Sequence, residues 1–157
     1  MIIETLALLS PAYFSSPFAT FSRFFPRKHP VDLGYVLRDG HRILGDGKTW
    51  EGLVLGTAFG GAVGALIYTW FGISENPFLI AFLGLCGDML GSFVKRRMGL
   101  KRGEHAPLLD ELDFLAPPLV YTHPPAVDVV ILLLITPVLH KLASIAGYKM
   151  GVKHEPW

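Results

Sequence analysis

Long apolar runs restrict what this chain can fold into more than any other feature. The stretch LVLGTAFGGAVGALIYTWFG covers residues 53–72 without a charge, and FLIAFLGLCGDMLGSFV covers 78–94 with a single one. A helix needs roughly 20 mostly apolar residues to cross a bilayer. Only 17% of the chain is charged, and its mean hydropathy is +0.43. The composition therefore indicates an all-α integral membrane protein rather than a soluble domain.

The positions of Lys and Arg predict about five transmembrane helices in one polytopic domain. The expected spans are residues 2–25, 53–72, 78–97, 108–121 and 126–148. Basic loops stay on the cytoplasmic side, and five spans place all 14 Lys and Arg on that side. One final helix would instead put Lys141, Lys149 and Lys153 outside. We expect the N-terminus outside, the C-terminus inside, and two polar cytoplasmic loops at 26–52 and 98–107.

The second and third spans each carry a stripe of glycines at helical spacing. These are Gly56, Gly60 and Gly64 in one span, and Gly84, Gly87 and Gly91 in the other. Small residues in such stripes let helix backbones approach closely in lipid. We therefore expect these two spans to pack together and to bring the two polar loops side by side.

Asp88 lies inside the third span, where an ionisable residue is costly and is by default a functional candidate. Lys95 follows seven residues later, on nearly the same helical face and roughly 10 Å further along the helix. Two interpretations stay open from this helix alone. One is a structural Asp88–Lys95 pair, or a lysine that snorkels to the interface, and the other is a catalytic site where the helix leaves the bilayer.

The first loop is rich in glycine and charge, and it includes the segment GDGKT. This segment resembles the end of a phosphate-binding P-loop, but Arg42 stands where that motif needs its first glycine. The aspartate spacing of the loop does not fit an EF-hand either. Backbone at Gly45 and Gly47, with Lys48 and Arg42, suits the binding of phosphate oxygens. A solvated, turn-rich loop is the alternative.

The second loop, KRRMGLKRGEHAPLLDELDF, joins a basic cluster to an acidic one. The basic cluster alone is typical of a membrane anchor. Asp110 and Asp113 are three residues apart, so a helix would present them on one face. They either complement the dipole of a helix N-terminus or bind Mg²⁺, which prefers carboxylate oxygens. Carboxylates for a metal beside cations for anionic oxygens suit phosphoryl or nucleotidyl transfer to or from a lipid.

Two stretches, PVDLGYVLRDGHRILGDGKTWEG and GDMLGSFVKRRMGLKRGEHAPLLDELDF, resemble the archaeal CDP-archaeol synthases. With the five-span layout the resemblance covers nearly the whole chain, apart from a small departure in the PVDLG segment. That family consists of CTP-dependent cytidylyltransferases, similar in chemistry to CDP-diacylglycerol synthases. The resemblance implies a multi-pass enzyme of the cell membrane. It would transfer CMP from CTP to unsaturated archaetidic acid (2,3-bis-O-geranylgeranylglycerol 1-phosphate), with Mg²⁺ as cofactor.

The resemblance also implies roles for individual residues. The expected metal ligands are Asp110, Asp88, Asp113 and Asp39. The expected substrate- and phosphate-binding residues are Arg42, Lys48, Thr49, Lys95, Arg96 and Lys101, with Gly45 and Gly47. The expected catalytic residues are Asp88, Lys95, Asp110 and Lys48. The expected partners are CTP, an isoprenoid glycerol phosphate lipid and the bilayer, with no nucleic acid and with the oligomeric state left open.

Two other classes compete with this interpretation. A CDP-alcohol phosphotransferase also uses aspartate-rich helices, but its motif needs a glycine after the second aspartate, and Phe114 follows Asp113 here. A small channel or transporter should place polar residues along a path at mid-membrane. Nearly all ionisable groups of this chain fall on the cytoplasmic side, which disfavours transport. Consumption of CTP separates a synthase from both alternatives.

Overall fold

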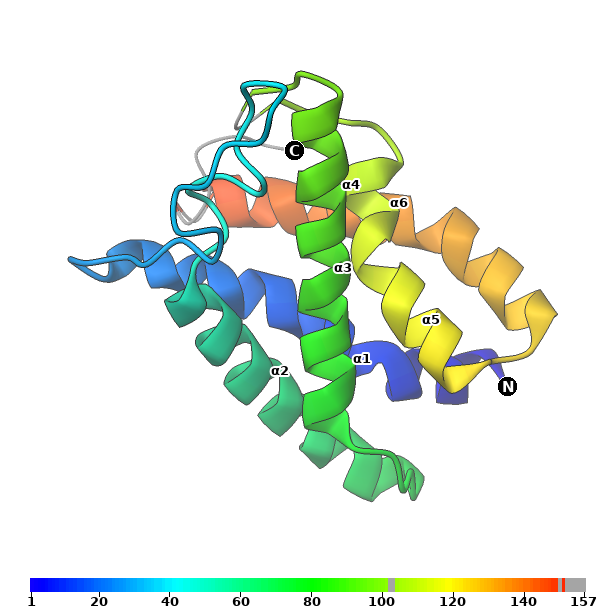
Figure 1. Ribbon diagram of the computed structural model, residues 1–157. Helices are drawn as coiled ribbons and strands as arrows, with labels where there is room; N and C mark the ends of the chain where they lie inside the picture. The colour runs from blue at the N-terminus through cyan, green and yellow to red at the C-terminus, as the bar shows by residue number, and fades with distance from the viewer. Residues whose placement is uncertain (102–103, 150, 152–157) are drawn as a thin grey trace.

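The computed structural model describes residues 1–101, 104–149 and 151, and that part of the chain is helical with no β-strand. Its elements are α1 (Ile2–Thr20), η1 (Phe21–Phe24), α2 (Trp50–Phe71), α3 (Pro77–Arg97), α4 (Leu109–Leu112), η2 (Asp113–Leu115), α5 (Ala116–Thr122) and α6 (Ala126–Lys149). We call the connection at residues 25–49 loop 1 and the connection at 98–108 loop 2. The predicted all-α class is confirmed for the described residues, and Figure 1 shows their arrangement.

Local signals in the sequence determine where α2 and α3 begin and end. The hydroxyl of Thr49 accepts an N–H from the first turn of α2 at 3.1 Å, and Gly72 ends the helix in the left-handed conformation. The side chain of Asn76 accepts two N–H groups from the first turn of α3, at 3.0 and 3.3 Å. Pro77 opens α3, at a position that needs no N–H donor.

α1 contains two internal prolines, and at the first of them hydroxyl groups bond to the helix carbonyls. Proline lacks an N–H, so Pro11 leaves the carbonyl of Ala7 without its usual helical donor. The hydroxyl of Ser10 donates to that carbonyl at 2.7 Å. The next carbonyl along the helix, that of Leu8, accepts the hydroxyl of Tyr68 from α2. The Tyr68 bond joins α1 to α2, and both bonds satisfy backbone carbonyls, as a membrane-embedded helix requires.

The glycine stripes of α2 and α3 are packing surfaces, and α1 packs against most of the α2 stripe and against Gly84 of α3. A Cβ atom on Gly60 would lie 2.8 Å from the Cα of Ser15, and one on Gly84 would lie 2.8 Å from the Cβ of Ala12. α2 and α3 do contact each other, and the first turn of α3 covers Gly61. A glycine stripe in the sequence indicates that another segment packs closely, but it does not specify which one. Here α1 also carries small residues, Ala12 and Ser15, at these contacts.

The predicted fourth span, 108–121, is not one helix. It consists of α4, the 3-10 turn η2 and α5, and two prolines lie in the first turn of α5. The segment lies directly on α3. A Cβ atom on Gly91 would lie 1.8 Å from the carboxylate of Asp113, and one on Gly87 would lie 2.2 Å from the Asp113 carbonyl oxygen. Glycine at both positions is what lets this broken segment reach the α3 backbone.

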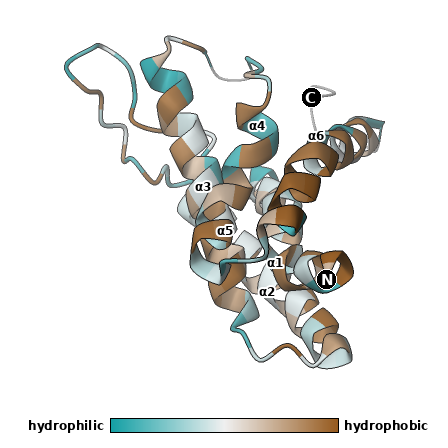
Figure 2. Cartoon of the chain, turned by 90° about the vertical axis from the view of Figure 1, so that its right-hand side faces the viewer, coloured by the Kyte–Doolittle hydropathy of each residue, from teal (hydrophilic) through white to brown (hydrophobic). Residues whose placement is uncertain are grey.

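Polar contacts show that the first and last helices run in the same direction. Thr5 of α1 donates to Asp128 of α6 at 2.6 Å, and the hydroxyls of Tyr13 and Thr136 lie 2.5 Å apart. Both pairs are separated by the same 123 residues of chain. Loops 1 and 2 both lie around the C-terminal end of α3, at the top of Figure 1. Hydrophilic colours gather on that end of α3 and on α4 in Figure 2.

Three helices in the described part of the chain are long and apolar enough to cross a membrane, namely α2, α3 and α6. Their outward side chains are strongly exposed, and Leu66 and Trp70 of α2 have 73% and 88% of their surface accessible. Such exposed apolar surface is expected of a lipid-facing helix. The other two predicted spans correspond to the proline-containing α1 and to the short α4 and α5. The five-span topology stays a prediction.

The close approach at Gly60 yields a test of the packing. The substitution Gly60→Ala places a methyl group against the backbone of α1, so the two helices must separate. Overpacking of this kind costs about 1–3 kcal/mol. We expect a lower thermal unfolding temperature in detergent. Ala62→Val adds apolar volume to an exposed position of the same helix and should leave that temperature unchanged. Equal effects of the two variants would contradict the packing described here.

Candidate active site

Two ion pairs join the third helix to both polar loops. The ammonium of Lys48, from loop 1, lies 2.6 Å from the carboxylate of Asp88 on α3. The ammonium of Lys95, near the end of α3, lies 2.9 Å from the carboxylate of Asp110 on α4. All four side chains are largely shielded, with between 14% and 29% of their surface accessible. Asp88 and Lys95 therefore pair with partners on other segments rather than with each other.

Asp110 has both carboxylate oxygens engaged. One accepts from Lys95, and the other accepts the backbone N–H of Ala106 at 2.9 Å. The N–H of Asp110 in turn donates to the Ala106 carbonyl at 3.0 Å. These two bonds fix the last residues of loop 2 against the first turn of α4. Loop 2 is further held by Glu111, whose carboxylate lies 2.9 Å from the ring of His105.

A cavity of about 150 Å³ lies between loop 1 and the end of α3. Its walls are Leu44, Gly45, Asp46, Gly47 and Lys48 from loop 1, with Ser92, Lys95 and Arg96 from α3. Three cationic residues, Lys48, Lys95 and Arg96, and one acidic residue, Asp46, thus line the cavity. The negative end of the helix dipole stabilises the cations in the last turn of α3. The backbone of the two glycines leaves room for an anion to approach, so the cavity is suited to phosphate groups.

Asp32 organises the part of loop 1 that lines the cavity. Its carboxylate accepts two hydrogen bonds from Arg42, at 2.5 and 3.2 Å, and one each from the backbone N–H groups of Leu44, Gly45 and Gly34. Burial raises the pKa of this carboxyl, but the hydrogen bonds outweigh burial and hold the pKa well below its usual range. Asp32 therefore remains ionised and fixes the backbone at residues 44–45.

Several residues predicted to contact substrate have other partners in the structure. The guanidinium of Arg42 bonds to Asp32 and, at 2.9 Å, to Asp46. The hydroxyl of Thr49 caps α2, and its side chain is buried. Neither residue lines the cavity. Lys101 lies outside the cavity wall as well, and its N–H donates to Glu104 at 2.8 Å.

The four predicted metal ligands are not brought together as one cluster. Asp39 pairs with Arg97 at 2.9 Å, away from the other three. The charges of Asp88 and Asp110 do act on Asp113, which lies against α3 in the same region. No three His, Cys, Asp or Glu side chains within residues 1–101, 104–149 and 151 are placed to share one metal ion. Instead, one oxygen of Asp88 pairs with Lys48, and one oxygen of Asp110 pairs with Lys95.

The prediction from sequence missed Ser92 and Asp32. Ser92 lines the cavity, and it lies four residues after Asp88 and three before Lys95. Helical spacing places all three on one face, so this residue could have been found from the sequence. Asp32 carried only the weak signal of an aspartate two residues before a glycine, which is typical of a turn.

The fold and the site define a helical membrane protein with a cationic pocket at one end of its long helices. The family model for CarS-like CDP-archaeol synthases matches residues 1–157. A CDP-archaeol synthase of Aeropyrum pernix is 42% identical, with 99% of this chain and 92% of the relative covered. One from Pyrobaculum calidifontis is 39% identical, with 99% and 98% covered.

A solved structure shares the fold as well. It is described as an intramembrane enzyme for archaeal membrane lipids biosynthesis, and it is 40% identical to this chain with a TM-score of 0.81. The match covers 92% of this chain and 95% of that one. The chain therefore belongs to the CDP-archaeol synthase family, and it is a CTP-dependent cytidylyltransferase of archaeal lipid biosynthesis. Membership implies CTP and a lipid phosphate as substrates, and a divalent metal requirement in general.

The buried carboxylate of Asp32 predicts a pH dependence for loop 1. Because its pKa is lowered in the folded protein, it stabilises the loop above the unfolded value of about 3.9. That contribution is lost as the pH falls below this value toward the folded pKa. Asp32→Asn should lose about 3 kcal/mol of local stability already at neutral pH, because Arg42 is left without its buried counter-ion.

The measurement is hydrogen exchange at the Leu44 and Gly45 amides, corrected for the pH dependence of the exchange rate in an unfolded chain. Asp46→Asn is the matched control, because it removes the other carboxylate bound to Arg42. The side chain of Asp46 is 63% exposed. An exposed pair is worth about 0–1 kcal/mol. Equal loss of protection in both variants would contradict the central role of Asp32.

Proposed function

We propose that the chain transfers CMP from CTP to unsaturated archaetidic acid, giving CDP-archaeol and pyrophosphate, in a Mg²⁺-dependent reaction. The observation that carries the proposal is the cavity between loop 1 and α3, which is lined by three cationic residues, Lys48, Lys95 and Arg96, and by a single acidic one, Asp46. A triphosphate brings several negative charges to one place, and a set of fixed cations suits that charge. Family membership supplies the nucleotide and the class of lipid.

The proposed chemistry is a direct in-line displacement. An oxygen of the lipid phosphate attacks the α-phosphorus of CTP and forms a new P–O bond. The bond between the α-phosphorus and the bridging oxygen breaks, and its electron pair leaves with pyrophosphate. The lipid phosphate is already anionic near neutral pH, so no covalent enzyme intermediate is required. Positioning and charge neutralisation then provide the rate enhancement.

The residues of this chain have distinct roles in that reaction. Lys95 and Arg96 bind the phosphates that leave as pyrophosphate, and Lys101 of loop 2 assists them. Lys48 neutralises the incoming lipid phosphate or the α-phosphate, while the Gly45–Gly47 backbone lies against the nucleotide. Lys48 and Lys95 already lie within 3 Å of carboxylates, at 2.6 and 2.9 Å, so both ammonium groups are held near the cavity before substrate binds.

Asp88, Asp110 and Asp113 would hold Mg²⁺. Carboxylate oxygens are the donors this cation prefers, and the charges of Asp88 and Asp110 both act on Asp113. Since no three carboxylates among the described residues are placed to share one ion, metal binding would require these side chains to move together. When bound, the cation would neutralise phosphate charge. Each of Asp88 and Asp110 holds a lysine on one oxygen. A cation bound to the same carboxylates would weaken these two ion pairs and leave the lysines available to bind phosphate.

The membrane setting of the proposal follows the basic residues. We propose a multi-pass protein of the cell membrane with five spans, both loops in the cytoplasm, and the lipid chains between helices. α2, α3 and α6 have the required length and composition. CTP is a soluble nucleotide, so a cavity at one end of α3 beside both polar loops suits its entry from water while the lipid arrives from the bilayer.

The first test is pyrophosphate release by the purified protein in detergent, with CTP, Mg²⁺ and an ether-linked glycerol phosphate. We expect release that depends on the lipid and that drops at least 100-fold in Asp110→Asn, because removal of one charge-stabilising group typically costs that much. Glu75→Gln is the control, since Glu75 lies exposed between α2 and α3 at the end far from the cavity. Release from a CDP-lipid in place of CTP would indicate a phosphotransferase instead.

The second test concerns the metal. Chelation with EDTA should abolish pyrophosphate release, and added Mg²⁺ should restore it. Asp88→Asn should raise the Mg²⁺ concentration for half-maximal activity by about tenfold or more, because the site loses a charged ligand. Glu75→Gln should leave that concentration unchanged. Full activity in EDTA would overturn the role of these carboxylates.

A further inference from the structure

Arg97 is the last residue of α3, and it lies beside the cavity without forming part of its wall. Its side chain turns to loop 1 instead. One terminal nitrogen lies 2.9 Å from the carboxylate of Asp39. The other donates to the backbone carbonyls of Arg42 and His41, at 2.6 and 3.3 Å. The guanidinium also lies 5.2 Å from the centre of the Phe93 ring, on its own helix.

We propose that Arg97 is a positioning residue, which holds loop 1 against α3 so that Lys48 and the Gly45–Gly47 backbone face the phosphates of CTP. The proposal rests on the function proposed above and specifies which residue builds that side of the site. In this proposal Arg97 itself does not contact either substrate, because both of its terminal nitrogens are already bonded to loop 1.

The segment that Arg97 holds is connected to the cavity wall by a short series of bonds. Arg97 binds the backbone carbonyl of Arg42, and the side chain of Arg42 binds Asp32. Asp32 accepts the N–H groups of Leu44 and Gly45, which are wall residues. A displacement of residues 39–42 from α3 is therefore transmitted to the wall within two residues of chain.

The contacts of Arg97 require an arginine rather than any cation. A guanidinium has five donors in a rigid plane, so it can bind a carboxylate and two carbonyls while it stacks on a ring. A lysine has one small ammonium group at the end of a flexible chain and can satisfy only part of this set. The series Arg97, Arg97→Lys and Arg97→Ala should therefore show three levels of activity rather than two.

The same geometry changes the expected role of Asp39. One of its oxygens accepts from Arg97, and the other accepts the N–H of His41 at 3.1 Å. Both oxygens are committed to holding the turn at residues 39–42. Asp39 therefore acts as the counter-ion of Arg97 in this proposal, and Asp39→Asn should resemble Arg97→Lys in direction and size.

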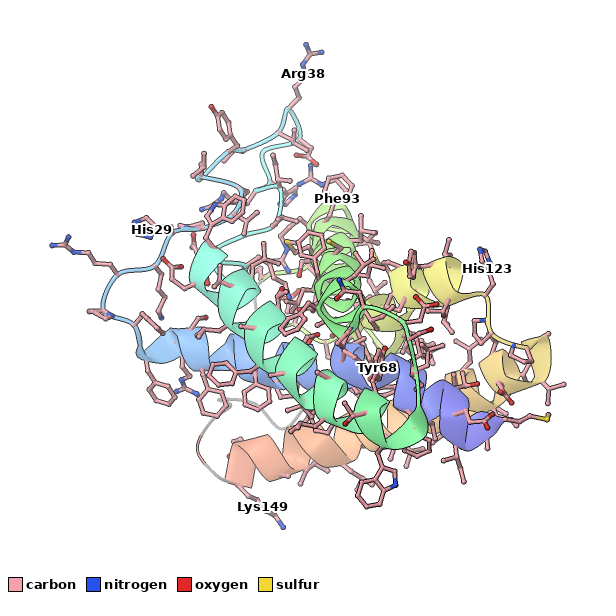
Figure 3. The ribbon with its side chains drawn as sticks, turned by 90° about the horizontal axis from the view of Figure 1, so that it is seen from below. His29, Arg38, Tyr68, Phe93, His123 and Lys149 are labelled. Atoms are coloured by element: carbon pink, nitrogen blue, oxygen red, sulfur yellow. The ribbon has the colours of Figure 1, made fainter. Side chains whose placement is uncertain are left out.

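The experiment compares Arg97→Ala, Arg97→Lys and Asp39→Asn with the matched control Arg38→Ala. Arg38 is the neighbour of Asp39, is exposed, and forms no ion pair or hydrogen bond with a described residue. Figure 3 shows it at the outer edge of loop 1, pointing away from α3. The readouts are hydrogen exchange of loop 1 without substrates, and the KM values for CTP and for the lipid in the pyrophosphate assay.

We expect Arg97→Ala to speed exchange of loop 1 and to raise the KM for CTP about tenfold or more, because charge-assisted hydrogen bonds are lost. The KM for the lipid should change less than that for CTP. Arg97→Lys and Asp39→Asn should fall between the wild-type protein and Arg97→Ala, and Arg38→Ala should match the wild-type protein. The two milder variants also decide the matter if Arg97→Ala fails to fold.

An unchanged KM for CTP in Arg97→Ala and Arg97→Lys would overturn the proposal, as would an equal effect of Arg38→Ala. Faster exchange with a loss confined to kcat would overturn it too, since that pattern indicates general destabilisation. If the wild-type protein releases no pyrophosphate from CTP, the proposed function fails. The exchange measurement then still decides whether Arg97 holds loop 1.

Discussion

The C-terminal end of α3 is the interaction centre on which both polar segments depend. Asp88 and Arg97 hold loop 1 there, and Lys95 holds α4. Loop 1 has no regular secondary structure of its own beyond isolated bridges, so its position depends on side-chain contacts. The end of α3 thus supports two polar segments, and the cavity lies between this end of the helix and residues 44–48 of loop 1.

The four side chains of the two ion pairs are also those proposed to bind the charged ligands: Asp88 and Asp110 the metal ion, and Lys48 and Lys95 the phosphates. A carboxylate shielded from water needs a counter-ion, and removal of one partner of such a pair leaves a costly unpaired charge. Lys48 and Lys95 supply the counter-ions in the structure. A divalent cation could replace them at Asp88 and Asp110 and would release two ammonium groups beside the cavity.

Much of the fold and part of the site follow from residues close together in sequence. Apolar runs of membrane length indicate α2, α3 and α6, because a bilayer admits only backbone that satisfies its own hydrogen bonds. Helical spacing also predicts which residues share a face, as Asp88 and Lys95 nearly do. The family resemblance predicts phosphate-binding roles for Lys95 and Arg96, and both residues line the cavity. The helix repeat makes such relations independent of the rest of the chain.

Only the tertiary structure decided which distant groups meet. The sequence determined that Asp88 would need a partner, but the partner is Lys48, forty residues earlier, rather than Lys95 on the same helix. It determined the glycine stripes but not that α1 would pack on Gly60 and Gly84 while Asp113 packs on Gly87 and Gly91. The physical reason is that loop 1 has no helical or strand periodicity from which the positions of its side chains could be predicted. Glycines with positive φ, at Gly40 and Gly45, redirect its backbone, and side-chain bonds over long range then select one conformation.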